Sequence, residues 1–271
     1  MEIWGGNEGT QTAVSMPGID AFVYARPYAG ESCGGDVHYV SLCSGGKIGR
    51  FVVADVAGHG DEAGQTAAEL RGLMRRYINT PDQSRFTRAL NRAFLGKSAA
   101  GRFATALLAT YYTPTDRLII CNAGHPRPLH WSARTGLWRA LDEHDCAGQD
   151  GAVNLPLGII DPTEYTQFSV ALEREDLVLI HTDSILEARD AAGSMLGEQG
   201  VLDILGELDA GRADELAGRI MERVRAYSGG HEPDDDVTLL VLRHNAQEPP
   251  RYSVMQKARM FARWAGFTGQ G

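Results

Sequence analysis

Four short acidic motifs, spread along the whole chain, carry the residue types that could bind metal ions. They are Gly34-Gly35-Asp36, Asp55-Val56-Ala57-Gly58-His59-Gly60, Thr182-Asp183-Ser184 and Asp235-Asp236-Val237-Thr238. Carboxylates that converge from strand ends supply the oxygen ligands that hard divalent cations prefer. A pair of such cations can hydrolyse a phosphate ester through an activated water, without a protein nucleophile.

Each motif taken alone also has an ordinary structural explanation. A single aspartate can cap a helix or close a turn, and Gly-Gly-Asp is a common turn sequence. Asp55 is more informative, because it follows the apolar run 51–54 and precedes Gly58 and Gly60, where the backbone must approach something closely. A carboxylate at such a position is costly unless it is paired or bound to metal. Together, on strands that could lie side by side, the four motifs predict a carboxylate-rich site for hard metal ions.

The elements that must position these aspartates are grouped strands and helices. Alternating or continuously apolar runs predict strands at 37–43, 47–54, 104–112, 117–122, 129–131, 137–140, 166–172, 176–181 and 237–242. Apolar residues repeating every three or four positions predict helices at 67–78, 84–95 and 213–227. This order favours an α+β fold with two packed antiparallel β-sheets flanked by helices, in αββα layers.

The sequence predicts three stretches of the chain, of which the middle one is the domain. We expect an N-terminal extension at 1–20, one domain at 21–243 and a tail at 244–271. Glu248-Pro249-Pro250 breaks the chain, and residues 252–265 then show the apolar spacing of a short basic helix. This helix packs on the domain itself or contacts a partner or a membrane. Regulation would come from a separate protein, from the first twenty residues or from this tail.

Composition excludes several classes of protein. The chain has 271 residues and a net charge of −9, which argues against a nucleic-acid-binding protein and fits a carboxylate-based metal site. An ordinary acidic protein would have the same charge. Cys33, Cys43, Cys121 and Cys146 form no C-x-x-C pair, so we expect free core thiols rather than a zinc site. No signal peptide and no apolar run near the roughly 18 residues of a membrane span is present, so we expect a cytoplasmic protein.

The residue sequences of the motifs are more informative than their spacing. The chain resembles the metal-dependent protein serine/threonine phosphatases of the PPM (type 2C) family, in the bacterial SpoIIE-like branch. The resemblance covers roughly residues 21–243, and the matching segments follow the family order. They are CGGD at 33–36, VVADVAGHG at 52–60, NAGHP at 122–126, LPLG at 155–158, TD at 182–183, EAR at 187–189 and DDVTLLV at 235–241.

The resemblance implies a β-sandwich flanked by helices, with two Mn²⁺ or Mg²⁺ ions at one edge. Carried over by position, Asp55 would bridge the two ions, and the backbone carbonyl of Val56 would help to hold one of them. Asp183 and Asp235 would hold the other. Asp36 would be a ligand directly or through water. Asp36 and Asp55 are therefore the candidate catalytic residues.

The chain departs from the family pattern at several places. Ser184 stands where the family usually has glycine, which adds a side chain beside the expected metal site. Tyr39 stands where the branch often has a second aspartate, which puts one metal or substrate contact in doubt. Asp236 is the neighbour most easily confused with the expected ligand Asp235. His59 and His125 are expected to shape turns rather than to act as catalytic acids.

The resemblance implies a phosphatase that hydrolyses phosphoserine or phosphothreonine on a regulatory partner protein. In the SpoIIE-like branch that partner is usually an anti-anti-sigma factor. A catalytically weak phosphatase fold used only for binding is the alternative, and Ser184 and Tyr39 are its support. Retention of Asp36, Asp55 and the other acidic positions argues against it. A two-metal nuclease or phosphodiesterase would use similar chemistry, but the net charge of −9 disfavours it.

Overall fold

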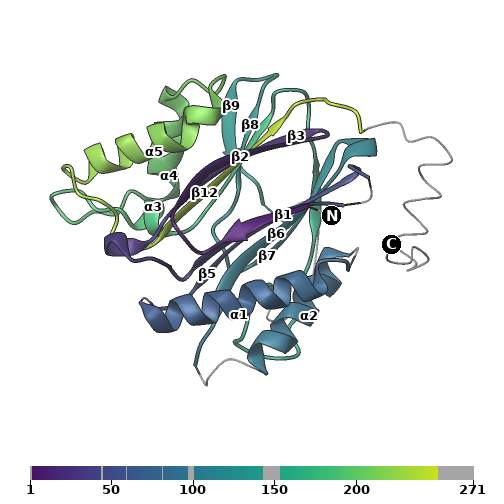
Figure 1. Cartoon of the computed structure of the whole chain (residues 1–271). Helices are drawn as coiled ribbons and strands as arrows, with labels where there is room; N and C mark the ends of the chain where they lie inside the picture. The colour runs from purple at the N-terminus through teal and green to yellow at the C-terminus, as the bar shows by residue number, and fades with distance from the viewer. Residues whose placement is uncertain are drawn as a thin grey trace, which may run out of the picture.

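The structure is a computed structural model that describes residues 2–43, 45–58, 60–80, 82–96, 101–142 and 153–249. Two six-stranded antiparallel sheets pack face to face, with helices on their outer faces (Figure 1). Sheet A has, in spatial order, β1 (Glu2–Gly6), β4 (Asp36–Cys43), β5 (Ile48–Val56), β6 (Ala104–Tyr112), β7 (Arg117–Ala123) and β10 (Phe168–Ala171). Sheet B has β2 (Thr10–Met16), β3 (Ile19–Arg26), β12 (Val237–His244), β11 (Leu177–His181), β8 (Leu129–Ser132) and β9 (Leu137–Ala140).

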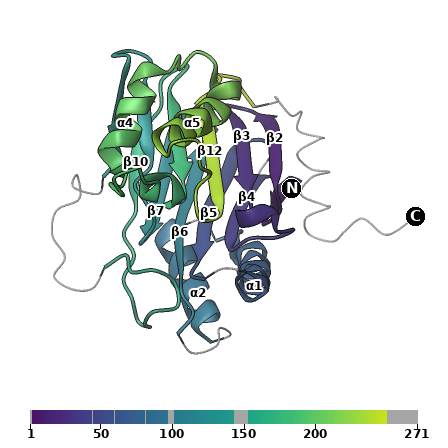
Figure 2. The ribbon, with the colours of Figure 1, turned by 90° about the vertical axis from the view of Figure 1, so that its left-hand side faces the viewer.

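Helices cover both outer faces of the sandwich (Figure 2). The helices α1 (Asp61–Tyr77) and α2 (Gln83–Leu95) lie on sheet A, and α4 (Gly197–Glu207) and α5 (Ala213–Tyr227) lie on sheet B. The four-residue helix α3 (Ser184–Glu187) follows β11. Two single turns of 3-10 helix, η1 (Tyr28–Gly30) and η2 (Thr113–Thr115), occupy connections. This arrangement confirms the predicted α+β fold with αββα layers.

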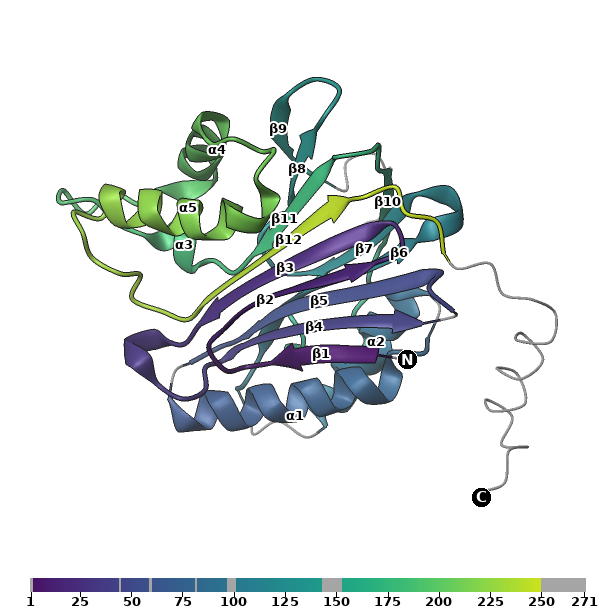
Figure 3. The same cartoon turned by 45° about the horizontal axis from the view of Figure 1, so that its top comes forward.

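The central strands are buried on both sides, which explains their continuous apolar sequence. On β5, Val52 and Ala54 pack against the helices, whereas Phe51 and Val53 face sheet B. Because successive side chains of a strand point to opposite faces, a strand between two packed layers must be apolar at every position. Figure 3 shows the strands of the two sheets running through the middle of the molecule between the helices.

Local sequence sets the ends of α2 and the face that it buries. Asp82 caps its first turn by accepting a hydrogen bond from the backbone N–H of Arg85 at 2.8 Å. Phe86, Leu90 and Phe94 repeat every fourth residue and are buried against sheet A. Truncating such a side chain typically costs about 2–5 kcal/mol.

The first twenty residues belong to the sandwich rather than standing apart from it. The strand β1 pairs with β4 at the edge of sheet A, and β2 pairs with β3 at the edge of sheet B. The sequence analysis predicted none of these three N-terminal strands. The segment of β1, Glu-Ile-Trp-Gly-Gly, is short and ends in two glycines, so it carries no periodicity. The predicted strand 47–54 also extends to Val56, so Asp55 lies inside β5 and not after it.

The predicted thiols differ in their surroundings. Cys121 is buried, but Cys33 and Cys43 are partly exposed, so the expectation that all the cysteines lie in the core was wrong for these two. Cys146, His59 and the basic tail helix at 252–265 lie outside the described residues. Within the described ranges, no helix has the length and apolar character needed to cross a membrane.

Candidate functional site

Asp36 and Asp55 stand directly opposite each other on neighbouring strands of sheet A. They are Cα partners in the antiparallel register of β4 and β5. Side chains at directly opposite positions have Cβ atoms about 4.5–5.5 Å apart and share one face. The adjacent residues Ala54 and Val56 pack on the helix side. The two carboxylates therefore point the other way, toward sheet B.

The acidic residues of sheet B lie at the same end of the sandwich. Asp183 follows β11, whereas Asp235 and Asp236 precede β12, and these two strands pair antiparallel with His181 opposite Leu239. In an antiparallel pair the end of one strand lies beside the start of the other. The two acidic motifs of sheet B are thereby adjacent, although about fifty residues separate them in the chain.

Thr182 joins the two sheets at this end. Its Oγ1 accepts a hydrogen bond from the backbone N–H of Thr238 at 3.0 Å and donates one to Asp36 Oδ2 at 3.0 Å. All three residues are buried. One hydroxyl therefore fixes the orientation of the Asp36 carboxylate relative to both strands of sheet B.

The carboxylates are close enough to disturb one another's protonation. Burial, followed by the charges of Asp183 and Asp235, raises the pKa of Asp55 from 3.8 to about 7. Burial and then the charge of Asp55 raise the pKa of Asp36 well above its usual value. Burial and then the charge of Glu187 raise the pKa of Asp183. Coulomb interactions of this size require proximity, so the four predicted aspartates converge.

The adjacent aspartates 235 and 236 have different surroundings. Asp236 is buried and accepts backbone hydrogen bonds on both oxygens, from Tyr28 at 2.7 Å and from Gly35 at 2.5 Å. A Cβ atom at Gly34 would lie 2.4 Å from this carboxylate, which explains the glycine there. Asp235 is exposed, accepts the N–H of Asp236 at 2.8 Å and lines a cavity. Asp236 therefore secures a turn, whereas Asp235 presents its carboxylate at the surface of the site.

The carbonyl oxygen of Val56 lies beside the glycine turn. A Cβ atom at Gly35 would lie 2.9 Å from this oxygen, so glycine leaves the carbonyl uncovered. The N–H of Val56 donates to the carbonyl of Gly35 at 3.3 Å. The backbone of the two glycine-containing motifs is therefore in direct contact, and a carbonyl oxygen joins the carboxylates as a potential hard ligand.

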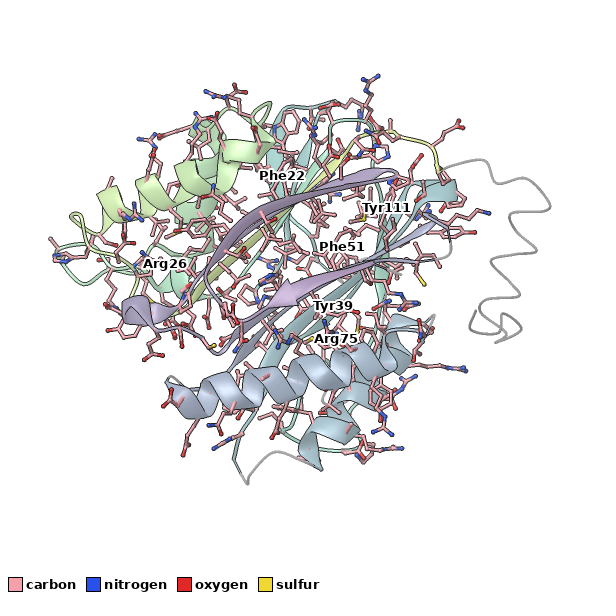
Figure 4. The ribbon with its side chains drawn as sticks, viewed as in Figure 1. Phe22, Arg26, Tyr39, Phe51, Arg75 and Tyr111 are labelled. Carbon is pink, nitrogen blue, oxygen red and sulfur yellow. The ribbon has the colours of Figure 1, made fainter. Side chains whose placement is uncertain are left out.

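The two departures from the family pattern have different surroundings. Tyr39 is fully buried and packs against α1, because the third residue after Asp36 on a strand faces the opposite way (Figure 4). Its side chain therefore lies on the opposite side of the sheet from the Asp36 and Asp55 carboxylates. Ser184 is buried, with its Oγ 3.4 Å from Thr182 Oγ1. Its hydroxyl therefore extends the hydrogen-bonded group around the residue that joins the sheets.

His125 shapes a turn behind the site. The Asn122 side chain accepts the N–H of His125 at 2.7 Å and donates to its carbonyl at 2.8 Å. The ring Nδ1 of His125 lies 2.8 Å from Oγ1 of Thr105, which is the Cα partner of Asp55 on β6. Burial, with a smaller effect of His181, lowers the pKa of His125 to about 3. The ring is therefore neutral near pH 7 and is not a proton donor there.

The sequence analysis missed two residues of this site. Glu187, at the end of α3, raises the pKa of both Asp55 and Asp183 through its charge. Thr182 holds Asp36, as described above. Both belong to segments quoted for the family resemblance, and that was the only available signal for them, because neither has a distinctive spacing of its own.

The residues fit divalent cations by chemistry and charge. In the described part of the chain, no three His, Cys, Asp or Glu side chains are placed closely enough to hold a metal ion by themselves. The donors are nevertheless carboxylates and one carbonyl, which suit Mg²⁺ and Mn²⁺. Burial, and then the charges of neighbouring carboxylates, raise the pKa of three of these aspartates. Bound cations would offset this repulsion.

A cavity of about 680 Å³ opens beside the carboxylates. One wall is α3 and the loop after it, and the other is the loop that leads from α5 to β12. Ser184, Glu187 and Asp235 line its inner part. Glu232 pairs with Arg26 and Arg225, which ties the second wall to β3 and α5. The volume lies in the range of small-molecule and peptide side-chain sites.

Known proteins are similar to this chain in sequence and in fold. Residues 46–245 match the family described as Stage II sporulation protein E (SpoIIE). The chain belongs to the SpoIIE family. A curated relative, phosphoserine phosphatase RsbU of Bacillus subtilis, is 26% identical over 195 residues, covering 72% of this chain and 55% of that protein. Phosphoserine phosphatase RsbP of the same organism is 21% identical over 197 residues, covering 71% and 45%. This SpoIIE-family chain thus spans about half the length of these relatives.

Solved structures share the fold. The RsbU and RsbW domains of Rv1364c from Mycobacterium tuberculosis superpose with a TM-score of 0.74 at 24% identity, covering 96% of this chain and 72% of that one. The PP2C phosphatase domain of SpoIIE from Bacillus subtilis, with a fragment of its regulatory domain, gives 0.71 at 17% identity, covering 89% and 64%. The catalytic domain of the serine/threonine phosphatase PstP, solved with two manganese ions, gives 0.56 at 16% identity, covering 83% and 97%. At these identities the likeness establishes the PP2C fold of the SpoIIE-family chain.

Proposed function

We propose that this SpoIIE-family chain is a metal-dependent phosphatase domain that hydrolyses phosphoserine or phosphothreonine on a regulatory partner protein. The convergence of Asp36 and Asp55 from sheet A with Asp183 and Asp235 from sheet B carries the proposal. The names of the relatives RsbU and RsbP, both phosphoserine phosphatases, agree with it.

In this proposal the chain holds two Mn²⁺ or Mg²⁺ ions with residues from both sheets. The residues that would hold them are Asp55, which would contact both ions, the Val56 carbonyl, Asp183, Asp235, and Asp36 directly or through water. When bound, such a pair supplies an activated water and charge stabilisation for in-line displacement at phosphorus. The chain's own contribution is orientation. Thr182 keeps its proton directed at Asp36 Oδ2, because its own oxygen already accepts the Thr238 N–H.

The substrate would enter from the cavity of about 680 Å³ beside Asp235. Its inner wall carries two residues next to the candidate ligands, Ser184 and Glu187. A phosphorylated side chain reaching inward would leave its flanking residues against α3 and the loop before β12. The most specific form of the proposal is a phosphorylated anti-anti-sigma-type factor as substrate. It rests on the family resemblance and on the RsbU-like relatives.

Hydrolysis of an aryl phosphate with added Mn²⁺ tests the proposal. We expect turnover by the wild type that depends on Mn²⁺ and falls by about 100-fold or more in Asp55→Asn, since charge stabilisation at a reacting centre is typically worth that much. Asp203→Asn is the matched control, because Asp203 is an exposed residue of α4 whose carboxylate accepts a hydrogen bond from the Gln199 side chain at 2.8 Å. Metal-independent turnover, or equal loss in both variants, would contradict the proposal.

The binding-only alternative loses its original support in the structure. Tyr39 lies in the helix-facing core, and the Ser184 hydroxyl is turned toward Thr182. Absence of any metal-dependent turnover in the wild type would restore this alternative.

A further inference from the structure

Asn7, in the short connection between the first two strands, is buried against the glycine turn Gly34–Gly35 that precedes Asp36. It follows β1, which pairs with β4 in sheet A, and it precedes β2, which pairs with β3 in sheet B. The residue is only 7% exposed, although connections between strands usually lie at the surface. Its side-chain amide therefore needs hydrogen-bond partners inside the protein.

Asn7 makes three hydrogen bonds to two segments that are distant in the sequence. Its backbone carbonyl accepts the N–H of Gly34 at 2.8 Å. Its side-chain amide donates to the carbonyl of Gly34 at 3.2 Å and to the carbonyl of Gly64 at 3.2 Å. Gly64 lies in the first turn of α1, and Figure 3 shows β1 running along this helix. One side chain therefore connects the glycine turn to the start of α1.

The glycine turn holds two groups of the proposed metal site. Asp36 follows the turn directly, and the carbonyl of Gly35 accepts the N–H of Val56 at 3.3 Å. The Val56 carbonyl is itself close to the turn, since a Cβ atom at Gly35 would lie 2.9 Å from its oxygen. A shift of the glycine turn would therefore displace the Asp36 carboxylate and the Val56 carbonyl together.

The bond to α1 restrains the far end of the second acidic motif. Residues 55–60 connect the end of β5 to the start of α1, and Val56 contacts the glycine turn near the beginning of this segment. Gly64 accepts from Asn7 just beyond its end. The helix lies close to the turn here, because a Cβ atom at Gly64 would lie 3.5 Å from the Cβ of Cys33. Asn7 therefore restrains both of the acidic motifs that come from sheet A.

We propose that Asn7 is a positioning residue for the divalent-cation site, an inference that rests on the proposed metal-dependent function. Its hydrogen bonds hold the glycine turn and α1 in the arrangement that binds the ions. Where a binding-competent arrangement is only partly populated, the apparent affinity falls by the same fraction. Loss of the Asn7 amide lowers that population to about a tenth, because its two buried hydrogen bonds are together worth at least about a factor of ten.

Asn245 provides a matched control at the opposite end of the sandwich. Its side chain donates to the Met16 carbonyl at 3.1 Å and to Asp20 Oδ1 at 2.8 Å, and its backbone N–H donates to the Gly18 carbonyl at 3.0 Å. It follows β12, whereas the acidic pair of sheet B precedes that strand. Asn245→Ala therefore removes the same kind of contacts without touching the acidic motifs.

Titration with Mn²⁺, followed by the electron paramagnetic resonance signal of the free ion, measures affinity independently of turnover. We expect Asn7→Ala to bind Mn²⁺ about tenfold more weakly than the wild type, and Asn245→Ala to bind it as tightly as the wild type. In aryl phosphate hydrolysis the half-saturating Mn²⁺ concentration should shift by the same factor, while kcat at saturating Mn²⁺ stays within about twofold. Simple loss of folded protein would instead lower kcat at every Mn²⁺ concentration.

Hydrogen exchange of backbone amides gives a second measurement that needs no activity. Because coupling between two sites is reciprocal, Mg²⁺ should slow exchange of the Gly34 N–H in the wild type and leave that of Asn245 unchanged. In the metal-free protein, Asn7→Ala should speed exchange of the Gly35 and Val56 N–H groups by about tenfold, whereas Asn245→Ala should not.

The outcomes separate this inference from the proposed function. A wild type that binds Mn²⁺ no more tightly than Asn7→Ala, or equal losses in the two variants, would overturn the role of Asn7 and leave the proposed function standing. Exchange of the Gly34 N–H that does not respond to Mg²⁺ would overturn it as well. A wild type that binds no Mn²⁺ at all would contradict the proposed function, and the inference would fall with it.

Discussion

The crowding of carboxylates predicts a specific pH dependence of stability in the metal-free protein. Asp55 has a pKa of about 7 in the folded protein, compared with 3.8 for the unperturbed group. The folded state therefore retains a proton that the unfolded state loses as the pH rises through 3.8. Ionised Asp55 destabilises the fold, and the loss accumulates until the pH passes about 7.

The total effect follows from the size of the shift. About three pKa units at about 1.4 kcal/mol each correspond to about 4 kcal/mol, and roughly 3 kcal/mol of this falls between pH 5 and pH 8. Buried histidines act in the opposite direction, because burial lowers the pKa of His125 to about 3 and that of His38 to about 4. Through these histidines the folded protein becomes more stable as the pH rises to about 6.5. The pH dependence of the wild type alone therefore does not isolate the contribution of Asp55.

Comparison with Asp55→Asn isolates the carboxylate, since both proteins share the same histidines. We expect urea denaturation in EDTA to give free energies of unfolding that differ little near pH 4. At pH 8 the variant should be the more stable protein, and the difference between the two should grow by about 3 kcal/mol from pH 5 to pH 8. Added Mn²⁺ should stabilise the wild type and not the variant. A difference that stays constant with pH would refute the proposed crowding.

Further predictions concern the residues that hold the site. Thr182→Val should cost about 1–3 kcal/mol in urea denaturation and reduce phosphatase activity, whereas Thr182→Ser should restore both, because the hydroxyl joins the two sheets. Gly34→Ala should lower the free energy of unfolding by about 1–3 kcal/mol, because the added Cβ would lie 2.4 Å from Asp236. Gly206→Ala, with nothing within 4 Å, should be neutral or stabilising. Asp236→Ala should cost stability by leaving the buried N–H of Gly35 and the partly buried N–H of Tyr28 without their acceptor, whereas Asp235→Asn should cost Mn²⁺-dependent turnover at nearly unchanged stability. A reversed pattern for this last pair would contradict the assignment of the two aspartates.

Much of the fold follows from local patterns in the sequence. The strand at 104–112 and the helix at 213–227 have the predicted bounds, because their apolar periodicity is strong and their ends carry turn residues. The family resemblance rests on short motifs in order, and the SpoIIE match over residues 46–245 confirms it. Three N-terminal strands escaped prediction. Two of them are edge strands: β2 buries only part of its side chains, and β1 carries two glycines. The third, β3, is an inner strand, and its largely buried residues were not recognised as a strand.

The chemistry of the site was determined by residue type, and its geometry by tertiary contacts. The sequence by itself identified the family and predicted hard-ligand chemistry for the acidic motifs. Only the tertiary structure paired Asp36 with Asp55 across two strands and placed Thr182 against a residue 146 positions away. It also separated Asp236, which holds two backbone amides, from the exposed Asp235. Strand register and long-range hydrogen bonds decide these points, and neither is encoded in the local pattern around a residue.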